Sequence, residues 1–143
     1  MRFWDSSAIV PLLIDEPKTR AMQQLIAADA EMAVWWAAAV ECVSAITRRD
    51  RSGLVSEAAR AVGRARLQAL APSWREVEPS AAIRETAVRL LQTHDLRAAD
   101  ALQLAAAFAA SEGRPPSLIF VALDSRLNEA AQREGFRLVE SEH

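Results

Sequence analysis

The sequence has 143 residues, of which 51% are hydrophobic and 25% are charged, and its formal net charge is −2. This composition excludes a disordered chain, and the length suits one domain with its own core, so we expect a single domain over residues 1–143. No apolar run reaches the ~18 residues that a membrane-spanning helix needs, and the first residues do not resemble a secretion signal. We therefore expect a soluble, cytoplasmic protein that does not bind a membrane.

Cysteine and histidine are too scarce for several kinds of site. The single cysteine, Cys42, excludes an internal disulfide and a zinc site built from cysteines. His94 and His143 are the only histidines, which excludes a histidine-rich metal centre and most Ser-His-Asp arrangements. We expect Cys42 to be a small buried residue, and His94 to be exposed at the C-terminal end of a helix. Any catalysis then has to depend on carboxylates.

The first half of the chain alternates predicted strands and helices. In chain order we expect a strand at 2–4, a helix from Asp5, a helix at 18–30, a strand at 32–36, and helices at 37–51 and 54–70. Asp5, Ser6 and Ser7 are N-cap residue types, which predicts that a strand ends and a helix begins there. Trp35 and Trp36 are consecutive in a predicted strand, so they should face opposite sides of a sheet that is covered on both faces.

The second half continues the alternation. The predicted elements are a strand at 74–78, helices at 80–93 and 96–110, a strand at 117–123, a helix at 125–134 and a strand at 136–139. The uninterrupted apolar run at 117–123 is typical of a central parallel strand, whereas 74–78 and 136–139 alternate apolar and polar residues like edge strands. The alternation of strand and helix predicts an α/β fold, with helices on both faces of a mostly parallel sheet.

The predicted helix at 96–110 consists almost entirely of alanine and leucine on every side, so it should be largely enclosed by protein. Asp100 places a charge inside this apolar helix. A buried carboxylate needs a compensating cation, metal or set of hydrogen-bond donors. An ion pair with Arg97, or the positive end of the helix dipole, would compensate the charge of Asp100 without any bound ligand.

Three further acids lie at or shortly after the carboxyl ends of predicted strands. Asp5 ends the first strand, Glu41 follows the second strand, and Asp124 ends the strand at 117–123. The carboxyl ends of parallel strands meet at one edge of a sheet, where ligands bind. A helix cap explains each acid separately, but acids gathered without cations would repel one another. The pattern therefore predicts a site for a hard divalent cation, Mg²⁺ or Mn²⁺.

Residues 44–75 form a basic segment, with seven arginines against Asp50 and Glu57, a local charge of +5. Such a run is either a solvated face or a surface for phosphates or an acidic partner, and we favour binding.

Four sequence motifs resemble the PIN-domain ribonucleases, and most closely the VapC toxins of bacterial toxin–antitoxin pairs. The matching segments are 3–8 (FWDSSA), Glu41 in an early helix, 96–105 (LRAADALQLA), and 120–127 (FVALDSRL) followed by Ala130, Ala131 and Gly135. The resemblance extends over the whole chain.

The resemblance implies a three-layer α/β/α sandwich with four to five strands, RNA cleavage that depends on Mg²⁺ or Mn²⁺, homodimerisation, and inhibition by a cognate, VapB-like antitoxin. By position, the catalytic and metal-binding quartet would be Asp5, Glu41, Asp100 and Asp124, with the Ser7 hydroxyl supporting Asp5. The candidate contacts to RNA or antitoxin are Arg48, Arg49, Arg51 and Arg97.

The chain departs from the family pattern at two positions. Gln103 stands where many relatives have histidine, a change we interpret as tolerated next to the metal-binding residues. Asn128, rather than another acid, lies near Asp124, so a second metal is expected to be weakly held or absent.

Other α/β proteins with acids at strand ends fit less well. A receiver domain needs a lysine after a late strand, yet Lys18 is the only lysine, and the phosphatases that use an aspartate nucleophile need a second aspartate where Ser7 stands. The non-enzymatic alternative is a protein-binding α/β module whose acids are helix caps and ion pairs.

Overall fold

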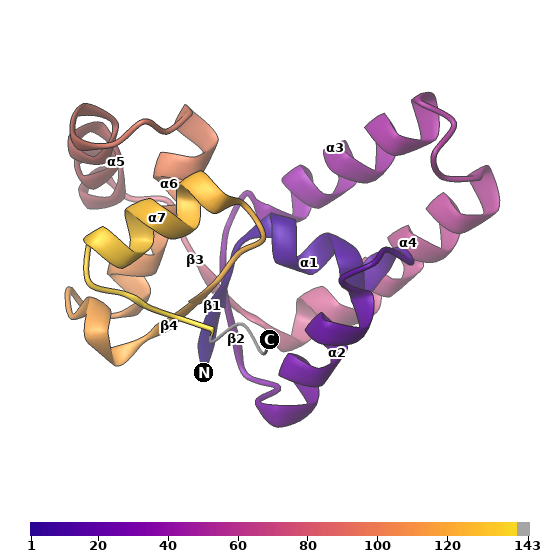
Figure 1. Cartoon of the computed structure of the whole chain (residues 1–143), viewed down its shortest axis with the longest axis horizontal. Coiled ribbons are helices and arrows are strands. Elements are labelled where there is room, and N and C mark those ends of the chain that lie inside the picture. The colour runs from indigo at the N-terminus through magenta and orange to yellow at the C-terminus, as the bar shows by residue number, and fades with distance from the viewer. Residues whose placement is uncertain (140–143) are drawn as a thin grey trace.

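The core of the fold is a parallel sheet. The computed structural model describes residues 1–139. Its five strands lie in the order β3-β2-β1-β4-β5 (Figure 1). The strands are β1 (Arg2–Trp4), β2 (Met32–Trp35), β3 (Arg75–Val77), β4 (Ile119–Val121) and β5 (Arg137–Leu138). All neighbouring pairs are parallel, so the carboxyl ends of the strands share one edge.

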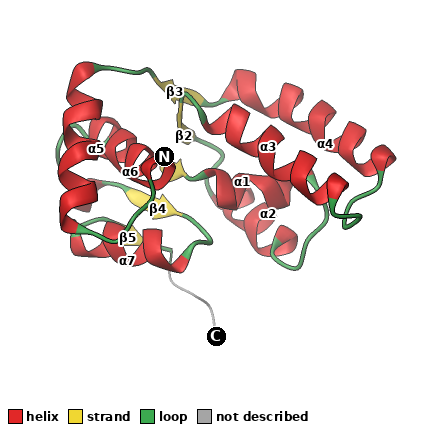
Figure 2. Ribbon diagram, turned by 90° about the horizontal axis from the view of Figure 1, so that it is seen from above, coloured by secondary structure: helices red, strands yellow, loops and turns green. Residues whose placement is uncertain are grey.

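Helices cover both faces of this sheet. They are α1 (Ser6–Leu13), α2 (Thr19–Ala28), α3 (Ala38–Arg51), α4 (Glu57–Leu70), α5 (Ala81–Thr93), α6 (Ala98–Ala110) and α7 (Ser125–Arg133), with short 3₁₀ turns at Ala71–Ser73 and Pro115–Ser117. Seen from above, α5, α6 and α7 lie on one side and α1 to α4 on the other (Figure 2). The predicted three-layer α/β/α fold is thus confirmed. None of the helices in residues 1–139 combines the length and apolarity needed to cross a membrane.

Alternating residues of the strands build the two cores. On β1, Phe3 packs with residues of α5, α6 and α7, whereas Trp4 packs with residues of α1, α2 and α3. Phe3 stacks on Phe120 of β4 with ring centroids 5.6 Å apart. Because both faces of β1, β2 and β4 are largely buried, these three strands can be short and mostly apolar.

β4 is an inner strand, between β1 and β5, and β3 and β5 are the edge strands, as predicted. Two details differ from expectation. β4 is shorter than the apolar run at 117–123, and Pro115–Ser117 form a 3₁₀ turn before it. Trp35 is buried in β2, but Trp36 lies beyond the end of the strand and is 51% exposed. Its backbone N–H donates to the Val77 carbonyl at 3.0 Å, which extends the pairing with β3 while the chain turns into α3.

The expectation that His94 is exposed is also wrong. His94 follows the last residue of α5, as predicted, but its side chain is only 6% exposed. Its Nε2 lies 2.7 Å from Glu134 Oε2, and Arg89 binds the other oxygen of Glu134 at 2.9 Å. Glu134 comes from the end of α7, so the residues near His94 in the sequence gave no indication of this contact.

Candidate active site

The four predicted acids lie around one cleft at the carboxyl edge of the sheet. The cleft has a volume of about 1130 Å³, and its walls come from the ends of β1 and β4, the first turns of α1, α3 and α6, and the side of α3. Among its lining residues are Asp5, Glu41, Asp100 and Asp124. The structure therefore brings together four carboxylates that are far apart in the sequence.

Asp5 is fixed between the end of β1 and the start of α1. It is the N-cap residue of α1 and is only 4% exposed. Its Oδ2 accepts hydrogen bonds from the Ser7 N–H at 3.1 Å and the Ser7 hydroxyl at 2.5 Å. Ser7 Oγ also accepts from the Leu123 N–H at 2.9 Å, so this hydroxyl ties Asp5 to the loop that carries Asp124. Burial raises the pKa of Asp5 to about 6; the Ser7 hydrogen bonds oppose the rise and the charge of Asp100 adds to it.

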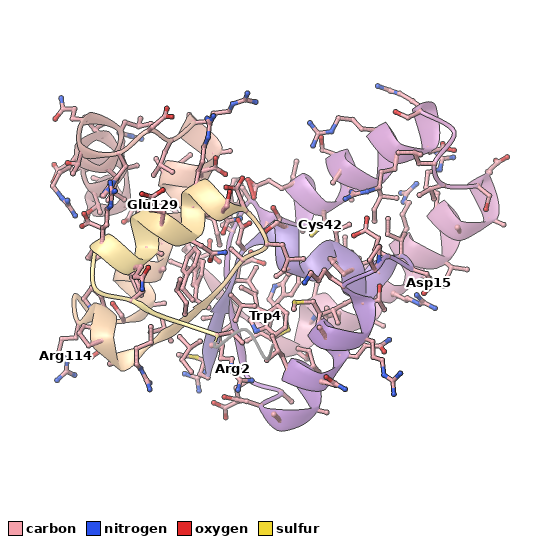
Figure 3. All side chains as sticks on the ribbon, in the orientation of Figure 1. Arg2, Trp4, Asp15, Cys42, Arg114 and Glu129 are labelled. Carbon is pink, nitrogen blue, oxygen red and sulfur yellow. The ribbon has the colours of Figure 1, made fainter. Side chains whose placement is uncertain are left out.

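Glu41 enters the cleft from the first turn of α3. The next residue, Cys42, is buried between α3 and α1 as predicted (Figure 3). Glu41 Oε1 accepts a hydrogen bond from Gln103 Nε2 at 2.5 Å. Burial raises the pKa of Glu41 to about 7, against the hydrogen bond from Gln103, and the charge of Asp5 contributes further.

Asp100 and Asp124 complete the acidic wall. Asp100 is half-buried in the first turn of α6, a helix enclosed as predicted. Burial raises the pKa of Asp100, and the charge of Asp124 is the next largest cause. Asp124 is the N-cap residue of α7, and its Oδ1 accepts from the Leu127 N–H at 3.0 Å. Within residues 1–139 no ion pair includes any of the four acids. The ion pair with Arg97 that could have compensated the charge of Asp100 is therefore not formed.

The donor set suits a hydrated divalent cation. Four carboxylates in one open cleft, none of them in an ion pair within residues 1–139, match the oxygen ligands that Mg²⁺ and Mn²⁺ prefer. No three Asp, Glu, His or Cys side chains in the described part of the chain are grouped so that they could hold an ion as they stand. Mg²⁺ is commonly held by one or two carboxylates together with water and substrate phosphate, and an open wall of acids fits that mode better than a closed cage does.

Comparison with known proteins identifies the family. Residues 2–133 match the profile of the PIN domain. The chain belongs to the PIN domain family. No curated protein sequence matches it.

Solved structures agree with this assignment. This PIN domain is similar in fold to the crystal structure of Mycobacterium tuberculosis VapC20, described as a toxin that cleaves the sarcin–ricin loop. The TM-score is 0.69 at 19% identity, over 95% of this chain and 96% of that one. FitAcB from Neisseria gonorrhoeae gives a TM-score of 0.65 at 16% identity, over 98% and 97% of the two chains. The predicted resemblance to PIN-domain proteins is confirmed at the level of family and fold.

Arginines flank the acids of the PIN domain on two sides. Arg48 and Arg49 line the cleft from α3, and Arg97 lines it from the start of α6. Arg49 is partly engaged, because its Nε lies 2.8 Å from Glu16 Oε1. Arg51 does not line the cleft. Three of the four predicted arginines therefore line the cleft, where they can contact a molecule that binds there.

Two residues of the site are not among the predicted contacts. Arg126 lines the cleft two residues after Asp124, outside the basic segment at 44–75. Gln103 is more than a tolerated change, because its side chain donates a hydrogen bond to Glu41. Its position one turn after Asp100 was the available signal, since a polar residue stood in an alanine and leucine helix.

Proposed function

We propose that this PIN domain is an endoribonuclease that depends on Mg²⁺ or Mn²⁺, a toxin of the VapC type. Asp5, Glu41, Asp100 and Asp124 are its catalytic and metal-binding residues. The observation that carries the proposal is the meeting of four carboxylates from four segments in one cleft, with raised pKa values for three of them and no ion pair to any of the four among residues 1–139. A folded protein has little reason to gather such charges unless a ligand compensates them.

The residues of the cleft have different roles in phosphodiester hydrolysis. When bound, the cation offsets charge that develops on the scissile phosphate and lowers the pKa of the attacking water. The four acids would hold the ion, and carboxylate oxygens not bound to it would orient the water. Ser7 keeps Asp5 in place, because its hydroxyl is anchored on the Leu123 N–H. No carboxylate has to transfer a proton itself.

The flanking arginines supply affinity for the RNA backbone. Arg97 and Arg126 line the cleft from the layer of α6 and α7, and Arg48 lines it from α3 in the opposite layer, so an RNA strand in the cleft can place phosphates against both groups. Contacts of this kind provide affinity and register rather than sequence choice. VapC20 is described as cleaving the sarcin–ricin loop, so a structured RNA loop is a suitable first substrate to test.

The resemblance to VapC toxins also supports proposals about partners. We expect a homodimer that acts in the cytoplasm and is neutralised by a cognate VapB-like antitoxin. The cleft that binds RNA offers such an antitoxin a set of arginines, including Arg48 and Arg97, that an acidic segment can occupy.

The alternative is a protein-binding module whose acids are structural, and one observation favours it. Asp5 and Asp124 are indeed N-cap residues, with side chains bonded to backbone N–H groups. Glu41 and Asp100 cap no helix, since Ala37 and Arg97 occupy those positions. Capping therefore explains only two of the four acids that line the cleft.

The decisive experiment is cleavage of total cellular RNA by purified protein with Mg²⁺, with Mn²⁺ and with EDTA. Asp100→Asn is the test variant, and Glu112→Gln, an exposed acid at the far end of α6, is the matched control. We expect discrete fragments only with metal, from the wild type and Glu112→Gln but not from Asp100→Asn. Equal behaviour of all three proteins under every condition would overturn the proposal in favour of the protein-binding module.

A further inference from the structure

The side chain of Gln103 connects the two helical layers at the cleft. Gln103 belongs to α6 on one face of the sheet, and Glu41 belongs to α3 on the other face. The hydrogen bond from Gln103 Nε2 to Glu41 Oε1 spans 62 positions of the sequence. Within the described residues it is the one side-chain hydrogen bond between α3 and α6, and no ion pair joins them. It therefore ties the Glu41 carboxylate to the helix that also carries Asp100.

An amide is an unfavourable choice for this position if stability alone is considered. Gln103 is only 1% exposed, and its neighbours along α6 are alanine and leucine. Its Oε1 is buried and has no hydrogen-bond partner in residues 1–139. An unpaired buried carbonyl lowers folding stability, whereas an apolar side chain of similar length would fill the same space without that penalty. Residues that break a local rule in this way are typical of functional sites.

An amide donor suits a carboxylate that has to bind a cation. The Nε2 group fixes one oxygen of Glu41 and carries no charge, so it does not neutralise the carboxylate. A lysine or arginine at the same place would form an ion pair and compete directly with a divalent cation. Hydrogen bonds from neighbouring side chains to ligating carboxylates commonly orient them for metal binding.

We propose that Gln103 is a positioning residue: it holds the Glu41 carboxylate at the cleft for a divalent cation, and it is kept there although it lowers the stability of the fold. This inference rests on the proposed function. It predicts that removal of the amide has opposite effects on two measurable quantities, the thermal stability of the metal-free protein and the affinity for Mn²⁺.

The test compares the wild type with Gln103→Met and Gln103→Leu in the full chain. Methionine keeps the length of glutamine without its polar groups, and leucine provides a second apolar variant in case the first packs poorly. Gln24→Met, at an exposed position on α2, is the matched control. Melting temperatures are measured without metal, and Mn²⁺ affinity is measured by titration calorimetry or by the loss of the free Mn²⁺ spectroscopic signal. RNA cleavage is assayed in parallel.

We expect both Gln103 variants to melt at or above the wild-type temperature and to bind Mn²⁺ roughly 10- to 100-fold more weakly. Gln24→Met should match the wild type in Mn²⁺ affinity. The double variant Glu41→Gln with Gln103→Glu should restore the hydrogen bond in reverse without restoring Mn²⁺ affinity, because the charge has moved to the other helix.

Other outcomes separate the two proposals. If the wild type binds Mn²⁺ and cleaves RNA, and the Gln103 variants bind Mn²⁺ equally well, the positioning role is wrong and the proposed function stands. If the variants are less stable but bind Mn²⁺ normally, Gln103 is structural. If the wild type neither binds Mn²⁺ nor cleaves RNA, the proposed function fails, and the positioning role fails with it.

Discussion

Asp5 and Glu41 face the same cleft from different helices, and the charge of Asp5 raises the pKa of Glu41. Burial is the larger cause for both residues, and their pKa values are about 6 and about 7. Hydrogen bonds from Ser7 and Gln103 oppose these shifts without cancelling them. Near neutral pH the metal-free protein therefore holds protons that the unfolded chain has already released. This difference in bound protons makes its stability depend on pH.

The first prediction concerns Glu41→Gln. As the pH rises from about 4.5 to about 7, unfolded Glu41 loses its proton and folded Glu41 keeps it, so the free energy of unfolding falls. Glutamine removes this fall and can still accept the hydrogen bond from Gln103. We expect the variant to be more stable than the wild type by about 1–2 kcal/mol at pH 8, allowing for solvent screening, with no gain at pH 4. Urea denaturation at several pH values measures this, with exposed Glu85→Gln as the control. A Glu41→Gln variant that is less stable than the wild type at pH 8 would contradict the raised pKa of Glu41.

The second prediction concerns stabilisation by Mg²⁺. Binding to the folded state alone raises the free energy of unfolding, by about 1.4 kcal/mol at tenfold excess over the dissociation constant, or roughly 5 °C in melting temperature. We expect this shift at pH 8. At pH 5 it should nearly vanish, because Asp5 and Glu41, with pKa values of about 6 and about 7, are then protonated.

Asp100→Asn is the control for this measurement, because it removes one ligand and should lose most of the shift at pH 8. Differential scanning calorimetry of both proteins with Mg²⁺ and with EDTA gives the answer. A shift of the same size at pH 5 and pH 8, or in both proteins, would mean that Mg²⁺ binds elsewhere.

Local patterns were sufficient to predict most of the fold. The alternation of apolar strands and amphipathic helices gave the element order, and the double-sided burial of Phe3 and Trp4 follows from the strand period of two. The exceptions depend on contacts between distant segments. The Trp36 N–H bonds to the Val77 carbonyl beyond the end of β2, and the His94 side chain bonds to Glu134, the residue after α7. Neither partner can be identified from the neighbouring sequence.

The site also has parts that the sequence predicts and parts that depend on contacts between distant segments. Chain order alone placed Asp5, Glu41, Asp100 and Asp124 at one edge, since parallel strands align their carboxyl ends. The polar Gln103 in an apolar helix indicates a residue of the site, but its partner Glu41 could not be predicted, because the hydrogen bond joins helices from opposite layers of the sandwich. The separation of Arg51 from the cleft also depends on which side of α3 faces the acids, a property of packing rather than of charge density.

The third prediction concerns Gly63, where α4 crosses α1 and α3. An added Cβ would lie 3.1 Å from Ile14 Cγ2 and 3.3 Å from the Leu13 carbonyl oxygen, and the latter belongs to the backbone and yields little. We expect Gly63→Leu to lower the free energy of unfolding by about 3 kcal/mol through overpacking. Ala65→Leu on the exposed side of the same helix should change it by less than about 0.5 kcal/mol. Equal stabilities of the two variants in urea would show that α4 packs more loosely than the structure indicates.

The fourth prediction concerns RNA affinity and the arginines of the cleft. Arg97 and Arg126 line it, and the 3.6 Å approach of Arg126 to Asp95 joins two exposed side chains, so this weak pair leaves Arg126 able to bind phosphate. Measured on an Asp100→Asn background that does not cut the probe, Arg97→Ala or Arg126→Ala should weaken binding of single-stranded RNA about 3- to 10-fold. Each should also reduce the slope of log affinity against log salt by roughly 0.7.

Arg114→Ala is the matched control for these variants, because Arg114 (labelled in Figure 3) is exposed, precedes the amino end of β4 and does not line the cleft. It carries the same charge change without a place in the cleft. Fluorescence anisotropy over a range of salt concentrations separates the two cases, because a phosphate contact changes the salt slope and a general charge effect acts on all three variants alike. If Arg114→Ala weakens binding as much as Arg97→Ala, the RNA does not run through the cleft, and the arginines there are free for an acidic protein partner instead.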